Sequence, residues 1–261
     1  MFKSVNNRFV GNLHSERIPF LIEQPEIMDD DMPEAIETKL ITTPSGESMG
    51  YLARPTSSGK HPAIVIQHGA FGMNDDIKDI AERYARLGFA AMALDLYLGK
   101  LLPTLEEGRA FAATIPDEEK FRRINSVADW LTSQDFADGP QFGITGFCMG
   151  GGLVLSIAAR NPNVRVCAPF YPVVREDMQM LASKIKSPVL EFHGSDEHEL
   201  AQKMQHAMNS HRRDFEVHVY EGARHGFFNR GQYHHVGAYD AWARVIPFFK
   251  KHLVRTPAGA R

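Results

Sequence analysis

The 261-residue chain has few cysteines, only Cys148 and Cys167, which is too small a number for a disulfide framework. It also has no H-E-x-x-H motif and no C-x-x-C pair, and its twelve histidines are scattered. These are the common signatures of zinc sites, so the sequence gives no indication of a bound metal. Cys167 lies in the middle of a predicted strand without neighbouring glycines, and we interpret it as a core residue.

Long apolar runs are lacking as well. The first twenty residues contain no apolar stretch as long as that of a signal peptide, and no segment approaches the ~18 apolar residues of a membrane span. We therefore expect a cytoplasmic protein. The charge is nearly balanced, with a formal net charge of −3, which argues against nucleic acid or an anionic membrane as a partner.

What the chain does have is a regular alternation of strand and helix patterns after a polar, proline-containing N-terminal extension, residues 1–36. Short apolar runs such as 62–68 are typical of strands buried on both faces. The first two strands, 36–43 and 47–55, are predicted to form a hairpin. We predict an α/β domain over residues 37–255, with a mostly parallel twisted sheet of about eight strands and helices on both faces.

The segment "GFCMGG" places Cys148 between a predicted strand and a helix that begins at Met149. A nucleophile on such a turn has a strained backbone, and residues two positions away fit only without side chains, as Gly146 and Gly150 do. The helix N-terminus favours a thiolate, and the N–H of Met149 could bind an oxyanion. Two alternatives stay open, namely a buried structural cysteine and a phosphate-binding turn, although the P-loop Lys-Ser/Thr pair is missing.

A thiol nucleophile requires a histidine that takes its proton and an acid that orients the histidine. Enzymes with this kind of turn have them in the order nucleophile, acid, histidine. Asp196 follows the predicted strand 187–194, and His225 follows the predicted strand 214–222, so we predict these two as the acid and the base. Glu197 is an alternative acid, and a loop or helix-cap role would also explain either carboxylate.

A second oxyanion donor is expected in the loop after the strand 62–68, which reads "HGAFGMND". Gly69 and Gly72 let this backbone approach a substrate closely. We predict the N–H of Ala70 as the donor, with that of Phe71 next in line. The alternative is an ordinary strand-to-helix turn.

Four segments, "HGAFGMNDDIKDIAERYARLGFAAMALDLY", "GFCMGG", "HGSDE" and "YEGARHGFFNR", together resemble the dienelactone hydrolase family of the α/β-hydrolase superfamily, over residues 37–253. The resemblance implies that fold and a triad of Cys148, His225 and Asp196. It also implies oxyanion donors at Met149 and Ala70, a small-molecule ester or lactone as substrate, and neither a metal nor an organic cofactor.

Two departures from the family pattern concern the substrate. A family glutamate that contacts the resting cysteine would fall at Gly69, and an arginine for the substrate carboxylate is replaced by Gly99, with Lys100 next. Arg230 is a candidate for the second family arginine. These losses weaken the case for dienelactone itself and favour a broader ester substrate.

We therefore expect an ester or lactone hydrolase that works through a thioester acyl-enzyme. The alternatives are a general carboxylesterase or thioesterase of the same fold, and a non-catalytic thiol-based sensor. The sequence leaves open the substrate, the role of residues 1–36 and whether the chain forms a homo-oligomer. The predicted substrate-binding residues, which suggest an apolar cleft, are Phe71, Tyr97, Tyr171, Phe227 and Arg230.

Overall fold

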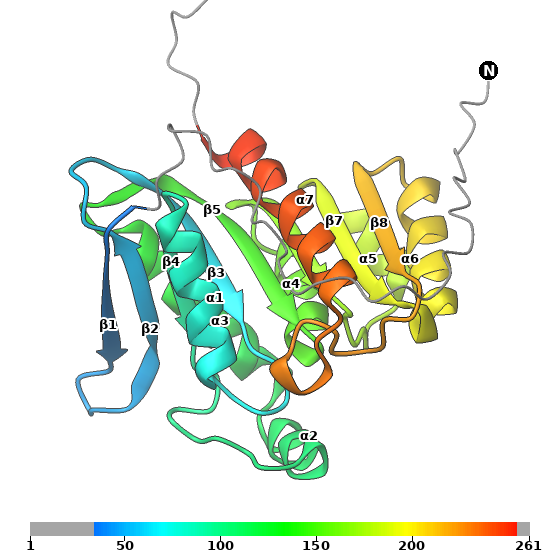
Figure 1. The fold of residues 1–261 in the computed structure, drawn as a ribbon, viewed down its shortest axis with the longest axis horizontal. Coiled ribbons are helices and arrows are strands. Elements are labelled where there is room, and N and C mark those ends of the chain that lie inside the picture. Colours follow the sequence, from blue (N-terminus) through cyan, green and yellow to red (C-terminus); the bar gives the residue numbers. More distant parts are fainter. Residues whose placement is uncertain (1–33, 255–261) are drawn as a thin grey trace, which may run out of the picture. The chain divides into compact units, whose positions relative to one another are not determined.

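A single mixed sheet of eight strands, in the order β1-β2-β4-β3-β5-β6-β7-β8, runs through the computed structural model, which describes residues 34–254 (Figure 1). The strands are β1 (Ile36–Thr42), β2 (Ser48–Pro55), β3 (His61–Gln67), β4 (Ala90–Leu94), β5 (Ala137–Phe147), β6 (Val164–Phe170), β7 (Val189–Gly194) and β8 (Phe215–Tyr220). The β1–β2 pair is the predicted antiparallel hairpin, and β2 also pairs antiparallel with β4. All the pairs from β4 through β3 to β8 are parallel, so the predicted fold class is confirmed.

Helices cover both faces of the sheet, and each face has its own apolar core. The α-helices are α1 (Asp75–Arg86), α2 (Leu105–Thr114), α3 (Asp117–Thr132), α4 (Met149–Ala158), α5 (Met178–Lys184), α6 (His198–Ser210) and α7 (His235–Leu253). Helices α1 and α7 lie on one face of the sheet and α3 to α6 on the other (Figure 1). The buried side chains of each set belong to a separate apolar cluster. Because both faces of the sheet are buried, the sequences of the central strands are almost continuous apolar runs.

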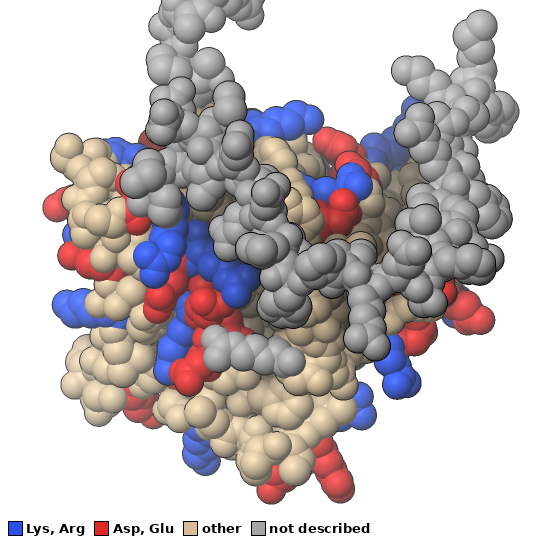
Figure 2. Space-filling view, viewed as in Figure 1, with Lys and Arg blue, Asp and Glu red and all other residues tan. Residues whose placement is uncertain are grey.

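Helix α1 shows how the sequence specifies a surface helix. Its N-cap Asn74 accepts a hydrogen bond from the Ile77 N–H at 3.2 Å, as its sequence pattern predicts. Its exposed face carries acidic and basic side chains spaced three or four residues apart, which form ion pairs. Figure 2 shows these opposite charges intermixed over this part of the surface.

The order in which successive strands are added to the sheet reverses at β3. From β3 the chain passes through α1 to β4 on one side, and it then returns to place β5 on the other side of β3. The loops that leave the carboxyl ends of β3 and β5 therefore diverge and open a crevice between them. Crevices at such a reversal are the usual ligand sites of α/β sheets.

Residues 1–33, most of the predicted extension, lie outside the described part of the chain, and β1 begins at Ile36. The proposed boundary between extension and domain stays a prediction. Among the helices of residues 34–254, none combines the length and the apolar character that crossing a membrane requires.

Candidate active site

Cys148 lies at the turn between β5 and α4 with a backbone conformation that few non-glycine residues adopt, φ 57° and ψ −119°. A Cβ atom on Gly146 would come within 2.5 Å of the Gly150 carbonyl oxygen, and one on Gly150 would collide with the carbonyls of Gln67 and His68. The prediction that both flanking positions require glycine is confirmed.

Three backbone hydrogen bonds hold this strained turn in place. The Cys148 N–H donates to the Phe170 carbonyl at 3.1 Å, and the Cys148 carbonyl accepts from Gly152 at 3.3 Å and from Val173 at 2.9 Å. These bonds come from β6, α4 and the loop after β6, so packing from several elements compensates for the strain. The thiol is half-buried, whereas Cys167 is fully buried in mid-strand, as predicted.

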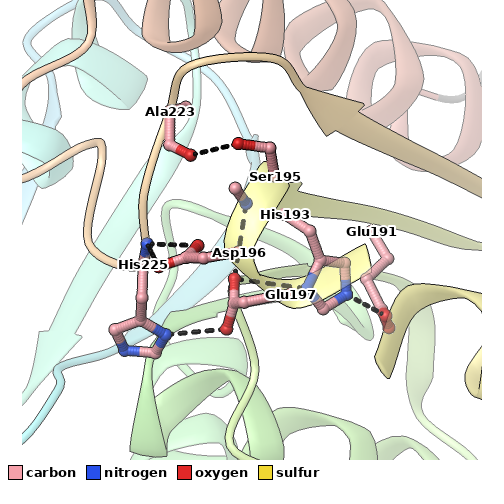
Figure 3. A network of polar contacts seen from close by, with 8 residues as sticks. Glu191, His193, Ser195, Asp196, Glu197, Ala223 and His225 are labelled. Atoms are coloured by element: carbon pink, nitrogen blue, oxygen red, sulfur yellow. Dashed lines mark hydrogen bonds and ion pairs between the residues drawn. The ribbon is translucent and has the colours of Figure 1, made fainter. Parts of the chain in front are cut away.

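The imidazole of His225 contacts Glu197 rather than Asp196. Glu197 ends the short 3-10 helix η2 (Ser195–Glu197), and its Oε1 lies 2.7 Å from His225 Nδ1 (Figure 3). Both oxygens of Asp196 instead accept the backbone N–H of His225, at 3.0 and 3.2 Å. In the structure, Asp196 therefore fixes the loop that carries His225, and Glu197, the alternative acid, meets the ring.

The electrostatics of His225 are set by its two partners. Burial lowers its pKa, but hydrogen bonds to Cys148 and Glu197 outweigh this and raise it to about 10. His225 is therefore charged at neutral pH. The fully buried ring of Tyr171 lies edge-on to the imidazole, with the ring centroids 5.1 Å apart, and supports it from behind.

Glu197 is ionised in this environment. Its burial raises its pKa, but hydrogen bonds from His193 and His225 and the charges of these rings lower it to about 2. A second anchor comes from the Gly194 N–H, which lies 3.3 Å from Oε2. The carboxylate thus stays charged at every pH near neutrality, and it faces His225 with a fixed oxygen.

The backbone N–H groups of Ala70 and Met149 are suited to bind an oxyanion. Met149 is the first residue of α4, so its N–H has no partner within the helix. His68 holds the peptide that links Gly69 to Ala70, because its Nδ1 lies 2.7 Å from the Gly69 carbonyl while its Nε2 accepts the Leu96 N–H at 3.1 Å. Since C=O and N–H point in opposite directions in a planar peptide, this bond also orients the Ala70 N–H.

His68 is a fixed neutral donor at this position. Complete burial lowers its pKa, so the ring carries a single proton. Because Nε2 accepts from Leu96, that proton is on Nδ1, where it points to Gly69. The sequence shows "HG" after a strand, but the contact with Leu96, two residues after the end of β4, is visible only in the fold.

A cleft of about 690 Å³ opens above Cys148 and His225, between the loop after β3, α2 and the loop after β8. Of the predicted substrate-binding residues, Phe71 lines it. Tyr97, Tyr171 and Phe227 are fully buried and are not among the described residues that line the cleft, which corrects the prediction. Their rings pack beneath the site, and the side chain of Arg230 lies outside what the structure describes.

Two arginines that the sequence did not single out line this cleft. Arg109 comes from α2, and Arg224 is the residue before His225. The position of Arg224 next to His225 was a usable signal, but nothing in the sequence places α2 over the carboxyl edge of the sheet. Within residues 34–254, no group of three or more His, Cys, Asp or Glu side chains is arranged to hold a metal ion.

Comparison with known proteins shows which family the chain resembles. Residues 49–253 match the model of the dienelactone hydrolase family. An Escherichia coli K12 protein named "Putative carboxymethylenebutenolidase" is 30% identical over 84% of this chain and 89% of its own length. A Bradyrhizobium protein named "Probable 2-oxo-3-(5-oxofuran-2-ylidene)propanoate lactonase" is 29% identical over 80% of this chain and 92% of its own.

A solved structure gives the same result at the level of the fold. The crystal structure of a "Putative Dienelactone Hydrolase" from Klebsiella pneumoniae superimposes with a TM-score of 0.74 at 28% identity, and covers 84% of this chain and 100% of its own. The match to the family model spans most of the chain. The chain therefore belongs to the dienelactone hydrolase family of ester and lactone hydrolases.

Proposed function

We propose that the protein hydrolyses small esters or lactones with Cys148 as the nucleophile, His225 as the acid and base, and Glu197 as the acid that orients His225. The observation that carries this proposal is the line of contacts from Glu197 through His225 to Cys148 at the floor of the cleft. A free thiol on a strained turn beside a charged imidazole is the arrangement that nucleophilic cysteines require.

In the first half of the reaction, the Cys148 thiolate attacks the substrate carbonyl carbon and a tetrahedral oxyanion forms. The N–H groups of Ala70 and Met149 stabilise this oxyanion, and one such donor contributes about 3–4 kcal/mol in related sites. The carbon–oxygen bond to the leaving group then breaks. His225 gives its proton to the departing alkoxide or enolate, which leaves a thioester on Cys148 and a neutral imidazole.

In the second half, neutral His225 takes a proton from a water molecule as its oxygen attacks the thioester carbonyl. The second tetrahedral intermediate collapses with cleavage of the carbon–sulfur bond, so the thiolate and the imidazolium are restored. The acid is released and ionises in solvent. Glu197 stays ionised throughout, and its charge stabilises the imidazolium that begins and ends the cycle.

The composition of the cleft supports a small substrate with an apolar body and a polar end. Phe71, Ile77 and Leu105 supply apolar surface, and the charged side chains of Arg109, Arg224, Asp76 and Asp196 supply polar surface. The relatives named as a lactonase and as carboxymethylenebutenolidases are consistent with cyclic esters. We propose small lactones and related carboxylic esters as the substrate class.

The two cysteines allow a matched test. Cys148→Ala removes the half-buried thiol above the cleft, and Cys167→Ala removes the buried one. Initial rates on p-nitrophenyl acetate and on a panel of lactones should fall at least a thousandfold in the first variant, and stay within a few-fold of the parent in the second. Ester turnover that survives Cys148→Ala would contradict the proposal.

A further inference from the structure

The polar contacts at Glu197 continue into the interior of the molecule through two more titratable side chains. His193 Nδ1 lies 3.4 Å from Glu197 Oε2, and His193 Nε2 lies 2.6 Å from Glu191 Oε1 (Figure 3). Glu191 and His193 stand two residues apart on β7, on the same side of the sheet, and both are fully buried. Neither lines the cleft, so neither can touch a substrate there.

Hydrogen-bond chemistry determines the charge of this group. An ionised carboxylate only accepts hydrogen bonds, so each of the two His193 nitrogens can make its contact only if it carries a proton. A neutral imidazole has one proton and would leave one carboxylate facing a bare nitrogen. With both carboxylates ionised, the arrangement therefore calls for an imidazolium at His193 between them.

The surrounding charges agree with this assignment. Burial lowers the pKa of His193, but hydrogen bonds and charge interactions with Glu191 and Glu197 raise it to about 9. Those two carboxylates, from its own strand and from η2, are the charged groups that act on the ring. Burial, and after it the charge of Glu191, raises the pKa of the Cys167 thiol on the neighbouring strand β6, so this cysteine stays neutral.

We propose that His193 is a positioning residue for the hydrolytic site, and that it acts through Glu197 with the buried Glu191 as its counter-ion. The inference rests on the proposed function, because its effect is expressed through His225 and Cys148. It extends the line of contacts to five groups, which are Glu191, His193, Glu197, His225 and Cys148.

The role follows from how Glu197 is held. A glutamate has one more rotatable bond than an aspartate, so its carboxylate has more freedom to lose when it is fixed. His193 and the Gly194 N–H occupy Oε2, which leaves Oε1 for His225. The positive charge of His193 also keeps Glu197 ionised although most of its surface is buried.

Glu191 depends on His193 in turn. Within residues 34–254, its Oε2 atom has no hydrogen-bond partner, so the interaction of Oε1 with His193 is what offsets the cost of burying this charge. Opposite charges thus alternate from Glu191 to Glu197. Loss of the His193 imidazolium would leave the buried carboxylates of Glu191 and Glu197 without the positive charge between them. The pKa of Glu197 would therefore rise, and it would accept a proton more readily.

The test is a double-mutant cycle on ester hydrolysis with His193→Gln and Glu197→Gln. His193→Gln alone should lower kcat on the order of tenfold with little change in KM, because a misplaced orienting group impairs the chemical step. The acid limb of its kcat/KM profile should move to higher pH. In the Glu197→Gln background the same change should cost less than about twofold, since its target is already lost.

A full tenfold loss from His193→Gln in the Glu197→Gln background would show that His193 supports the fold rather than Glu197, and would overturn the proposal. An unchanged rate and pH profile for His193→Gln alone would also overturn it. Far-ultraviolet circular dichroism and a thermal melt establish that the variants compared are folded.

If His193→Gln does not fold, the isosteric change Glu191→Gln carries the test. Without the Glu191 charge, His193 should lose its proton at a lower pH, and kcat should therefore begin to fall at a lower pH on the alkaline side than in the parent protein. Superimposable profiles would overturn the proposal. The proposed function fails separately, if Cys148→Ala and Glu197→Gln leave ester hydrolysis intact.

Discussion

At the scale of single residues, two adjacent carboxylates have different tasks. The sequence predicts Asp196, with Glu197 as the alternative, as an acid directly after β7, and the structure places Glu197 rather than Asp196 against the imidazole of His225. Asp196 and Glu197 point in different directions from the 3-10 helix η2, so one meets a backbone N–H and the other meets the imidazole. The directions of these two side chains depend on contacts between η2 and the loop after β8. No local sequence pattern predicts such contacts.

This difference gives the first prediction. Glu197→Gln should lower kcat by a factor on the order of 10²–10⁴, because the imidazolium loses the charge that orients and stabilises it. Asp196→Asn should lower kcat by no more than about tenfold, since its amide oxygen can still accept the His225 N–H. Steady-state rates on one ester compare the two variants. A larger loss for Asp196→Asn than for Glu197→Gln would restore Asp196 as the orienting acid.

The second prediction concerns His68. His68→Phe keeps an aromatic ring but removes both hydrogen bonds, so the peptide between Gly69 and Ala70 is no longer fixed. We expect kcat to fall by about tenfold or more, as for a weakened oxyanion donor. His68→Asn, whose side-chain amide can donate from near the position of Nδ1, should retain more activity. Equal activity of both variants would show that the hydrogen bond to Gly69 is unimportant.

At the scale of elements, most strand and helix bounds were predictable because periodicity and caps are local signals. The hairpin strands were expected at 36–43 and 47–55 and occupy Ile36–Thr42 and Ser48–Pro55, and the helix expected to begin at Met149 does begin there. The position of α2 was not predictable. Its Gly108 lies against the Ala70 carbonyl, so α2 covers the loop after β3. This contact depends on the path of the chain between β4 and α3.

The third prediction tests the packing of α4 beneath the turn. Gly150→Ala should reduce the free energy of unfolding by about 1–3 kcal/mol, because the added methyl group meets the carbonyls of Gln67 and His68. Gly231→Ala is the matched control, because an added Cβ there has no heavy atom within 4 Å. Urea unfolding of both variants measures the difference. A similar free energy of unfolding for Gly150→Ala and the parent would contradict the packing described here.

At the scale of the whole molecule, the fold was predictable because buried parallel strands and amphipathic helices leave a clear sequence pattern. The site was predictable only in part. Chain order places Cys148 and His225 at one edge of the sheet, and the structure brings them together there. Three of the four predicted aromatic residues, Tyr97, Tyr171 and Phe227, were misplaced because apolar residues near a site can equally form its floor, as Tyr171 does.

The fourth prediction concerns stability and pH. The pKa values of His193 and His225 rise in the folded protein from an ordinary 6.5 to about 9 and about 10. The folded state therefore binds more protons than the unfolded state between these values, and the stabilisation is complete below about pH 6.5 and lost as the pH rises toward 10. The free energy of unfolding should fall on the order of 1–3 kcal/mol over that range.

The acid side has the opposite sign. The pKa of Glu197 falls from 4.5 to about 2, so its contribution is complete above pH 4.5 and lost as the pH falls toward 2. Urea unfolding of the parent and of Glu197→Gln at several pH values measures both limbs. The variant should show a flatter alkaline limb, and an identical slope in both proteins would contradict the proposed charges.

The most direct test of the account is to observe the acyl-enzyme. During turnover of p-nitrophenyl acetate, rapid acid quenching and mass spectrometry should find one acetyl group per chain, on the peptide that contains Cys148. The adduct should be sensitive to hydroxylamine, as a thioester is, and it should be absent from Cys148→Ala. Turnover that proceeds with an acetyl group on another residue, or with full activity in Cys148→Ala, would contradict the central claim.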